Sequence, residues 1–171
     1  VGTAGGTLGH LVASAVVSTG RSVVALTPDE KSARALEADV EHFFSELARE
    51  RRPRVLRYPE HDLPPYSALR PDRRNVLERL AVMSELLRSA GSPVALVLSA
   101  SSVRRLVIPR TSFMERSFHL EFAQELERDE FLEQLDQAGY RKSPLVEERG
   151  TYAVRGAILD LFTPSAEEPV R

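Results

Sequence analysis

The first stretch with the composition of a chemical site is glycine-rich and runs Gly2-Thr3-Ala4-Gly5-Gly6-Thr7-Leu8-Gly9. A phosphate-binding P-loop has the pattern G-x-x-x-x-G-K-[ST], because its amides cradle the phosphates, its lysine reaches the β and γ oxygens and its hydroxyl holds magnesium. Aligned from Gly2, the pattern meets threonine at the second glycine, leucine at the lysine and glycine at the hydroxyl. We therefore predict a degenerate P-loop that binds no nucleotide. Its positions are Gly2, Gly5, Thr7, Leu8 and Gly9.

A dinucleotide-binding, Rossmann-like oxidoreductase is the alternative enzyme. A glycine loop followed by a helix, a strand and then an acid, here Asp29, is its general layout. The fingerprint G-x-G-x-x-G is absent, however, since the chain has Gly5-Gly6-x-x-Gly9, and its nearest tyrosine–lysine pair is Tyr140 with Lys142. A third interpretation is structural, because glycines also allow a tight turn and close helix packing.

The remaining polar residues form no pattern typical of catalysis or metal binding. The four histidines have no H-E-x-x-H arrangement, and the serines near residue 100 have no G-x-S-x-G around them. The absence of cysteine excludes disulfides, thiolate zinc sites and cysteine nucleophiles. We expect no catalytic residue, no cofactor and no metal site.

The first two thirds of the chain alternate between predicted strands and helices. Short β-branched runs predict buried strands over about 22–26, 55–58 and 94–98. Helical spacing predicts helices over about 10–18, 28–47, 72–89 and 99–107, with Thr27 as the cap of the second and Glu30 completing a capping box. This order predicts an α/β layer with a parallel sheet.

The pattern changes near residue 110. Strands are predicted over 113–122, 144–148, 151–155 and 157–162, with a helix over 129–138, which together indicate a small α+β domain with an antiparallel meander. The charge changes at the same place: residues 1–110 hold 16 basic and 12 acidic residues, a net of +4, whereas residues 111–171 hold 7 and 13, a net of −6. We therefore predict two domains, 1–111 and 112–171.

The overall composition is that of a globular protein. Of 171 residues, 42% are hydrophobic and 28% charged, and the net charge of −2 gives no general attraction for nucleic acid. No apolar run approaches the ~20 residues that span a bilayer, and no basic segment precedes the apolar stretch 11–17, so neither a membrane span nor a signal peptide is expected. We expect a cytoplasmic protein.

Four motifs, in order, resemble the N-terminal UvrB-homology region of the bacterial transcription-repair-coupling factor (Mfd) family. They are Ala4-Gly5 in the glycine loop; the run Val23-Val24-Ala25-Leu26-Thr27-Pro28-Asp29; the set Tyr58-Pro59, Leu63-Pro64-Pro65-Tyr66, Pro71 and Arg79-Leu80; and Ala138-Gly139-Tyr140-Arg141 with the unbroken run from Gly150 to Phe162. The last is the most specific, and the resemblance covers nearly the whole chain.

The resemblance implies a helicase-like domain 1a with a degenerate P-loop, followed by the small domain 2. The returning segment, domain 1b, is not expected within these residues, and the apolar surface it would cover suggests a weak homodimer. The DNA-clamping hairpin of UvrB has only the loop 59–71 in its place, so no damage verification is implied. Family members are ATP-dependent DNA translocases that contact RNA polymerase and DNA through other domains.

The resemblance also implies a partner. Domain 2 of the family recruits UvrA during transcription-coupled nucleotide excision repair, and the arginines of that contact match Arg155 and Arg171 here. Guanidinium groups suit such a role, since they pair with carboxylates through two parallel hydrogen bonds and are enriched at interface hot spots. The structural alternative is that Arg155 holds its own hairpin through a salt bridge to an acid such as Asp160. We thus expect a non-catalytic interaction fragment that recruits UvrA.

Overall fold

The computed structural model describes residues 6–171 except 62, 65, 90 and 122–123. The chain divides into two compact units, residues 1–105 and 106–171. Each unit has its own hydrophobic core and is described by itself. The assignment of residues 1–111 and 112–171 to domains 1a and 2 stays a prediction.

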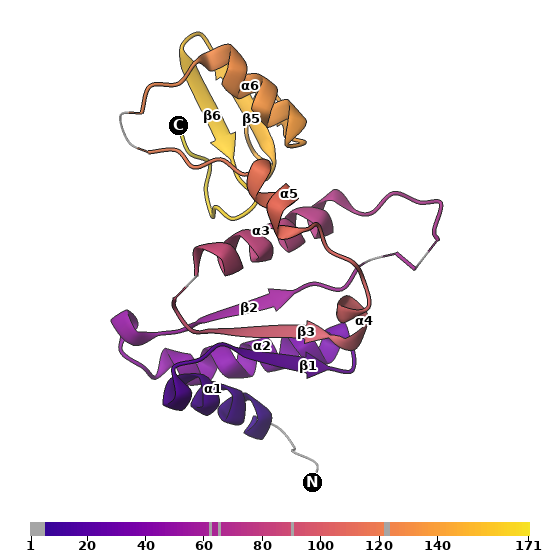
Figure 1. Ribbon diagram of the computed structural model, residues 1–171, viewed down its shortest axis with the longest axis vertical. Helices are drawn as coiled ribbons and strands as arrows, with labels where there is room; N and C mark the ends of the chain where they lie inside the picture. Colours follow the sequence, from indigo (N-terminus) through magenta and orange to yellow (C-terminus); the bar gives the residue numbers. More distant parts are fainter. Residues whose placement is uncertain (1–5, 62, 65, 90, 122–123) are drawn as a thin grey trace. The chain divides into compact units, whose positions relative to one another are not determined.

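The first unit is a three-stranded parallel sheet with helices on both faces (Figure 1). The strand order is β1-β3-β2, and both pairings are parallel, as the alternation of strands and helices predicted. Helices α1 and α2 lie on one face and α3 lies on the other. The elements are α1 (Thr7–Thr19), β1 (Val23–Thr27), α2 (Glu30–Ser45), the 3-10 turn η1 (Arg49–Arg51), β2 (Arg54–Tyr58), α3 (Arg73–Arg88), β3 (Val94–Ser99) and α4 (Ala100–Val103).

The start of α2 differs from the sequence-based expectation. Asp29, not Thr27, caps the helix, because its carboxylate accepts a 2.7 Å hydrogen bond from the amide of Ser32. Thr27 is still the last residue of β1, and its hydroxyl donates to the carbonyls of Asp29 and Leu98 instead. The cap lowers the pKa of Asp29.

The second unit is a helix packed on a small mixed sheet. Its elements are α5 (Arg110–Glu115), α6 (Arg128–Gln137), β4 (Arg141–Lys142), β5 (Thr151–Arg155) and β6 (Ile158–Phe162). Strands β5 and β6 form the predicted antiparallel hairpin, whereas β4 runs parallel to β5. Phe131 and Leu135 of α6 are buried against Tyr152 and Leu161 of the hairpin.

Two predicted strands of the second unit are wrong. Residues 110–115 form α5, and the described residues 117–121 form neither helix nor strand. Phe118 packs edge-to-face on Phe131 with ring centroids 5.1 Å apart, so its burial needs no strand. Residues 144–148 are also irregular, because the amides of Arg141 and Ser143 make the bonds to the β5 edge, and Pro144 has no amide hydrogen.

Candidate functional site

The described part of the predicted degenerate P-loop carries no lysine or arginine that could bind a phosphate. Gly2 and Gly5 lie outside the described residues, whereas Thr7, Leu8 and Gly9 form the first turn of α1. A Cβ atom on Gly9 would lie 2.5 Å from the Cβ of Asp39 on α2. Gly9 therefore allows α1 and α2 to pack closely, which supports the structural interpretation of that glycine.

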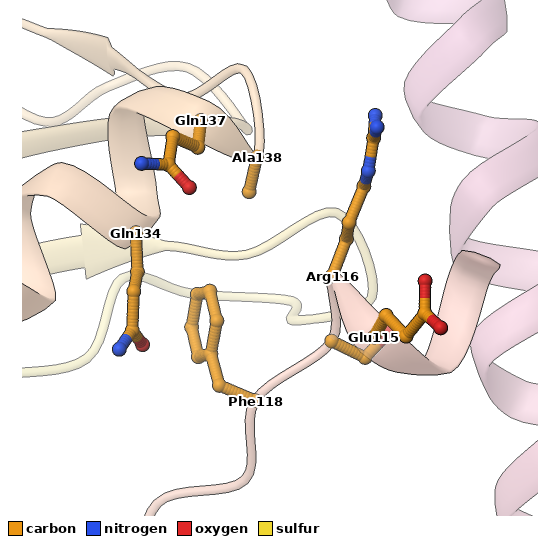
Figure 2. Close-up of a pocket in the computed structure, with 7 residues that line it drawn as sticks. Glu115, Arg116, Phe118, Gln134, Gln137 and Ala138 are labelled. Atoms are coloured by element: carbon orange, nitrogen blue, oxygen red, sulfur yellow. The ribbon is translucent and has the colours of Figure 1, made fainter. Parts of the chain in front are cut away.

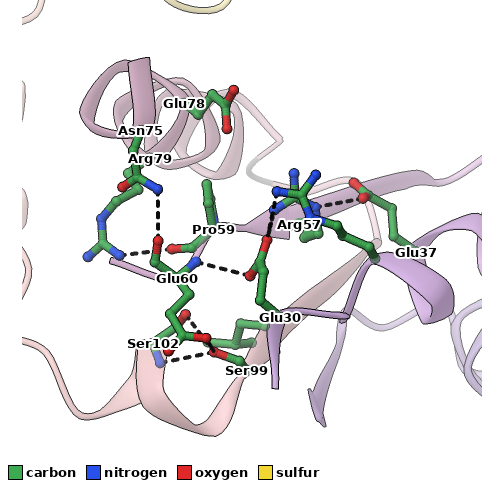
Figure 3. A network of polar contacts seen from close by, with 12 residues as sticks. Glu30, Glu37, Arg57, Pro59, Glu60, Asn75, Glu78, Arg79, Ser99 and Ser102 are labelled. Atoms are coloured by element: carbon green, nitrogen blue, oxygen red, sulfur yellow. Dashed lines mark hydrogen bonds and ion pairs between the residues drawn. The ribbon is translucent and has the colours of Figure 1, made fainter. Parts of the chain in front are cut away.

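Polar side chains gather where the strands of the first sheet end (Figure 3). Arg57 is only 13% exposed and donates to the carboxylates of Glu30 and Glu37, at 2.5 and 2.7 Å. Glu30 also accepts from the amide of Glu60, whose carboxylate accepts from the hydroxyl of Ser99. Burial raises the pKa of Glu37, and Arg57 opposes that shift.

A second arginine, Arg79, extends this network of polar contacts at the ends of the strands. The guanidinium of Arg79 lies 4.3 Å from the centre of the Tyr58 ring and donates to the carbonyl of Pro59 at 2.9 Å. Asn75 donates to the carbonyl of Glu60 at 2.8 Å. These bonds tie α2, β2, α3 and β3 together. Because Arg57 is paired with two carboxylates and Arg79 is bound to a carbonyl and an aromatic ring of the same unit, the network stabilises the fold of the first unit.

A hollow of about 330 Å³ lies between α5 and α6 in the second unit (Figure 2). It is lined by Glu115, Arg116, Ser117, Phe118, Gln134, Gln137 and Ala138. Its one hydroxyl, on Ser117, donates to the carbonyl of Phe113, so no nucleophile–base pair faces the hollow. Among the described residues, no group of His, Asp and Glu side chains could hold a metal ion, and no helix is long and apolar enough to cross a membrane.

The β5–β6 hairpin presents a different surface on the side turned away from α6. Side chains alternate along a strand and directly opposite residues share a face. Tyr152 and Leu161 are opposite each other on the α6 side, so the pairs Arg155 with Ile158 and Ala153 with Asp160 lie on the other side. We call this surface the arginine face; it comprises Arg149, Arg155, Ile158, Asp160, Phe162 and Arg171.

The structure brings the two predicted partner contacts together on the arginine face. Arg171 reaches it because Val170 pairs with Leu161 along β6, and its guanidinium binds both carboxylate oxygens of Asp160, at 2.7 and 3.3 Å. Arg155 is exposed and donates to the carbonyl of Pro144 at 3.0 Å. The salt bridge considered for Arg155 is thus formed by Arg171 instead.

The electrostatics of the arginine face centre on Asp160. The hydrogen bonds from Arg171 lower the pKa of Asp160, and the charge of Arg155 lowers it further. Asp160 in turn raises the pKa of Arg171. The side chain of Arg171 is nevertheless 68% exposed. Both arginines therefore remain accessible to a partner.

Sequence reasoning missed one member of the arginine face, Arg149. This exposed arginine places its guanidinium 5.8 Å from the centre of the Phe162 ring. Phe162 pairs with Thr151, so the ring lies on the same face as Asp160 two residues earlier. No local sequence signal marks Arg149, because its position beside Phe162 depends on the register of the hairpin.

Comparison with known proteins identifies the type of module in the second unit. Residues 118–171, which include the whole arginine face, match the family model described as the UvrB interaction domain. A stretch of 75 residues is 36% identical to UvrABC system protein B of Idiomarina loihiensis and covers 44% of this chain and 11% of that protein. The second unit therefore contains a module of the UvrB type.

Two longer matches extend over nearly the whole chain. It is 36% identical over 170 residues to the transcription-repair-coupling factor of Myxococcus xanthus, which covers 99% of this chain and 14% of that protein. It is 29% identical over 149 residues to the same factor of Escherichia coli strain K12, covering 87% and 12%. The chain belongs to the transcription-repair-coupling factor family, as its motifs predicted, and spans about one seventh of the length of these relatives. These matches give the oxidoreductase alternative no support.

Proposed function

We propose that this chain is a non-catalytic interaction part of a bacterial transcription-repair-coupling factor, and that it recruits UvrA during nucleotide excision repair in the cytoplasm. The observation that carries the proposal is the arginine face, where Arg155 and Arg171 are both exposed within the segment matching the UvrB interaction domain. The family membership supports the repair role.

The charges of the arginine face favour a protein partner with acidic groups. Residues 111–171 have a net charge of −6, so exposed guanidinium groups gathered on one face make a local positive surface on an acidic unit. Guanidinium–carboxylate pairs give directional, charge-assisted bonds, and complementary charges accelerate association. Arg155 is the stronger candidate anchor, since Arg171 already pairs with Asp160.

The first unit contributes structure rather than catalysis in this proposal. Leu8 stands where a P-loop needs lysine, and a hydroxyl-bearing side chain at Gly9 would collide with Asp39. ATP hydrolysis, DNA translocation and contact with RNA polymerase are then tasks of other domains of the full-length protein. Millimolar ATP or NAD(P) should leave the melting temperature unchanged. A hundredfold excess over Kd would otherwise stabilise the fold by about 2.7 kcal/mol.

The UvrA contact is tested by calorimetric titration of purified UvrA into the chain and into Arg155→Ala. Loss of a hot-spot arginine should cost about 2 kcal/mol, or roughly a thirtyfold rise in Kd, with an unchanged melting curve. Arg116→Ala is the matched control, because this exposed arginine lies in the same unit outside the arginine face. Unchanged affinity in Arg155→Ala would refute the proposal.

Weak self-association is a separate proposal that concerns the first unit. Val24 and Leu26 on the edge strand β1 are 61% and 59% exposed, and an open strand edge carrying apolar side chains favours pairing with a second copy. Sedimentation velocity over a range of concentrations should show a reversible dimer that Leu26→Lys abolishes. A monomer at every concentration would exclude it.

A further inference from the structure

We infer that Arg149 is a third partner contact on the arginine face, so that this face binds a row of carboxylates rather than a single one. The inference rests on the proposed function, because it concerns the same surface and the same partner. It adds a residue that neither the sequence motifs nor the family resemblance assigned.

Two of the three arginines contact alternate residues of β6, and the third lies on the neighbouring strand β5. Ile158, Asp160 and Phe162 are alternate residues on the arginine face, and alternate residues of a strand lie about 7 Å apart. Arg155 is opposite Ile158, Arg171 binds Asp160, and Arg149 lies over the Phe162 ring. The guanidinium groups of Arg149 and Arg171 therefore lie against residues two apart on β6, about 7 Å along the strand. Arg155 stands on β5 and donates to the carbonyl of Pro144, beside the other edge of that strand.

The contact with the Phe162 ring positions the Arg149 side chain before a partner binds. A guanidinium stacks on an aromatic face through cation–π attraction, worth about 0.5–1 kcal/mol at an exposed site. Such a contact restricts the long side chain in the free protein, so less conformational entropy is lost when a partner binds. The N–H groups of the guanidinium point outward in its plane and can still reach a carboxylate.

The charge balance of the unit indicates acidic protein rather than nucleic acid as the occupant. Three of the seven basic residues within 111–171 lie on the arginine face, and Asp160 is the one acid among the six residues that define it. The surrounding net charge of −6 would repel a long polyanion, whereas a partner presenting a few carboxylates meets only the local positive surface. Carboxylates two residues apart on a strand, or one turn apart on a helix, have the matching spacing.

Calorimetric titration of UvrA into Arg149→Met separates this inference from the proposed function. Methionine keeps an apolar stem over Phe162 but removes the charge, so the fold is retained. We expect about a tenfold rise in Kd, or 1.4 kcal/mol, and a weaker dependence of Kd on salt concentration. Arg149→Lys should recover part of the affinity, and Arg116→Ala should change neither quantity.

The possible results are distinguishable. Wild-type affinity in Arg149→Met, together with weakened binding in Arg155→Ala, would overturn the inference and leave the proposed function intact. Wild-type affinity in both Arg149→Met and Arg155→Ala would overturn both the inference and the proposed function. If Arg149→Met instead weakened binding to a single-stranded oligonucleotide while leaving UvrA affinity unchanged, the arginine face would be a nucleic-acid surface and the inference would be wrong.

Discussion

Two arginines held inside the first unit and the exposed arginines of the arginine face have opposite roles. In the first unit, the side chain of Arg57 is 13% exposed and Arg79 is buried, and their guanidinium groups are bound to carboxylates, a carbonyl and an aromatic ring of the same unit (Figure 3). In the second unit, Arg155 and Arg171 lie on an open hairpin face, and Arg171 remains 68% exposed even while paired. The same residue type therefore holds elements together in one unit and is available for a partner in the other.

The largest expected effect is on stability in the first unit. Arg79→Ala should lower the free energy of unfolding by about 3 kcal/mol, because it leaves a cavity beside Tyr58 and removes the donor to the Pro59 carbonyl. Arg155→Ala should change it by less than about 0.5 kcal/mol. Urea unfolding monitored by circular dichroism measures both.

The matched control for Arg79→Ala is Arg74→Ala on the same helix, whose side chain is 87% exposed and whose i,i+4 pair with Glu78 contributes little. Equal losses of unfolding free energy in Arg79→Ala and Arg155→Ala would mean that the two arginines do not differ in their structural role.

A somewhat smaller effect is expected where α1 packs on α2. Gly9→Ala should destabilise the first unit by about 2 kcal/mol, because its Cβ would lie 2.5 Å from the Cβ of Asp39. Gly6→Ala is the control, since its Cβ would meet only the Phe43 ring at 3.9 Å. Thermal unfolding of both variants tests this; equal stability would show that the glycine loop is not constrained by packing.

The smallest effect concerns the pH dependence of the arginine face. The folded-state pKa of Asp160 is lowered chiefly by hydrogen bonds from Arg171, so its contribution to stability is present above the unfolded value of about 3.9 and is lost as the pH falls through the folded value. An NMR titration of the Asp160 carboxyl should give a midpoint below about 3.9.

Two variants refine this titration. In Arg171→Ala the midpoint for Asp160 should rise, and in Arg155→Ala it should rise less, because Arg155 acts only through its charge. If the titration midpoint of Asp160 were the same in Arg171→Ala as in the wild type, the Arg171 side chain would not bind Asp160 in solution.

Local signals predicted most of the first unit. The β-branched runs gave β1, β2 and β3 to within one residue, and Asp72 before α3 marked its start. The failures lie where long-range contacts decide. Phe118, Leu120 and Phe122 alternate as in a strand, but Phe118 packs on Phe131 of α6 without strand pairing. Local sequence could not reveal that contact, because its partner lies thirteen residues further on.

For the candidate site too, the sequence predicted some residues and their contacts followed only from the fold. Arg155 was found through the resemblance because it lies in the unbroken run from Gly150 to Phe162, and the same resemblance assigned Arg171 nine residues beyond that run. Their common face, the pairing of Arg171 rather than Arg155 with Asp160, and the position of Arg149 over Phe162 all depend on the hairpin register and on the Leu161–Val170 bridge. The paired residues are 3 to 13 positions apart in the sequence, but which residue meets which follows only from the fold.

Arginine-selective dicarbonyl labelling read by mass spectrometry, with and without UvrA, tests whether the arginine face is open to a partner while Arg57 and Arg79 are held within the first unit. We predict that Arg149, Arg155 and Arg171 react in the free chain and are protected by UvrA. Arg57 and Arg79 should stay unreactive in both states. Equal labelling of the three arginines in the presence and absence of bound UvrA would contradict the account.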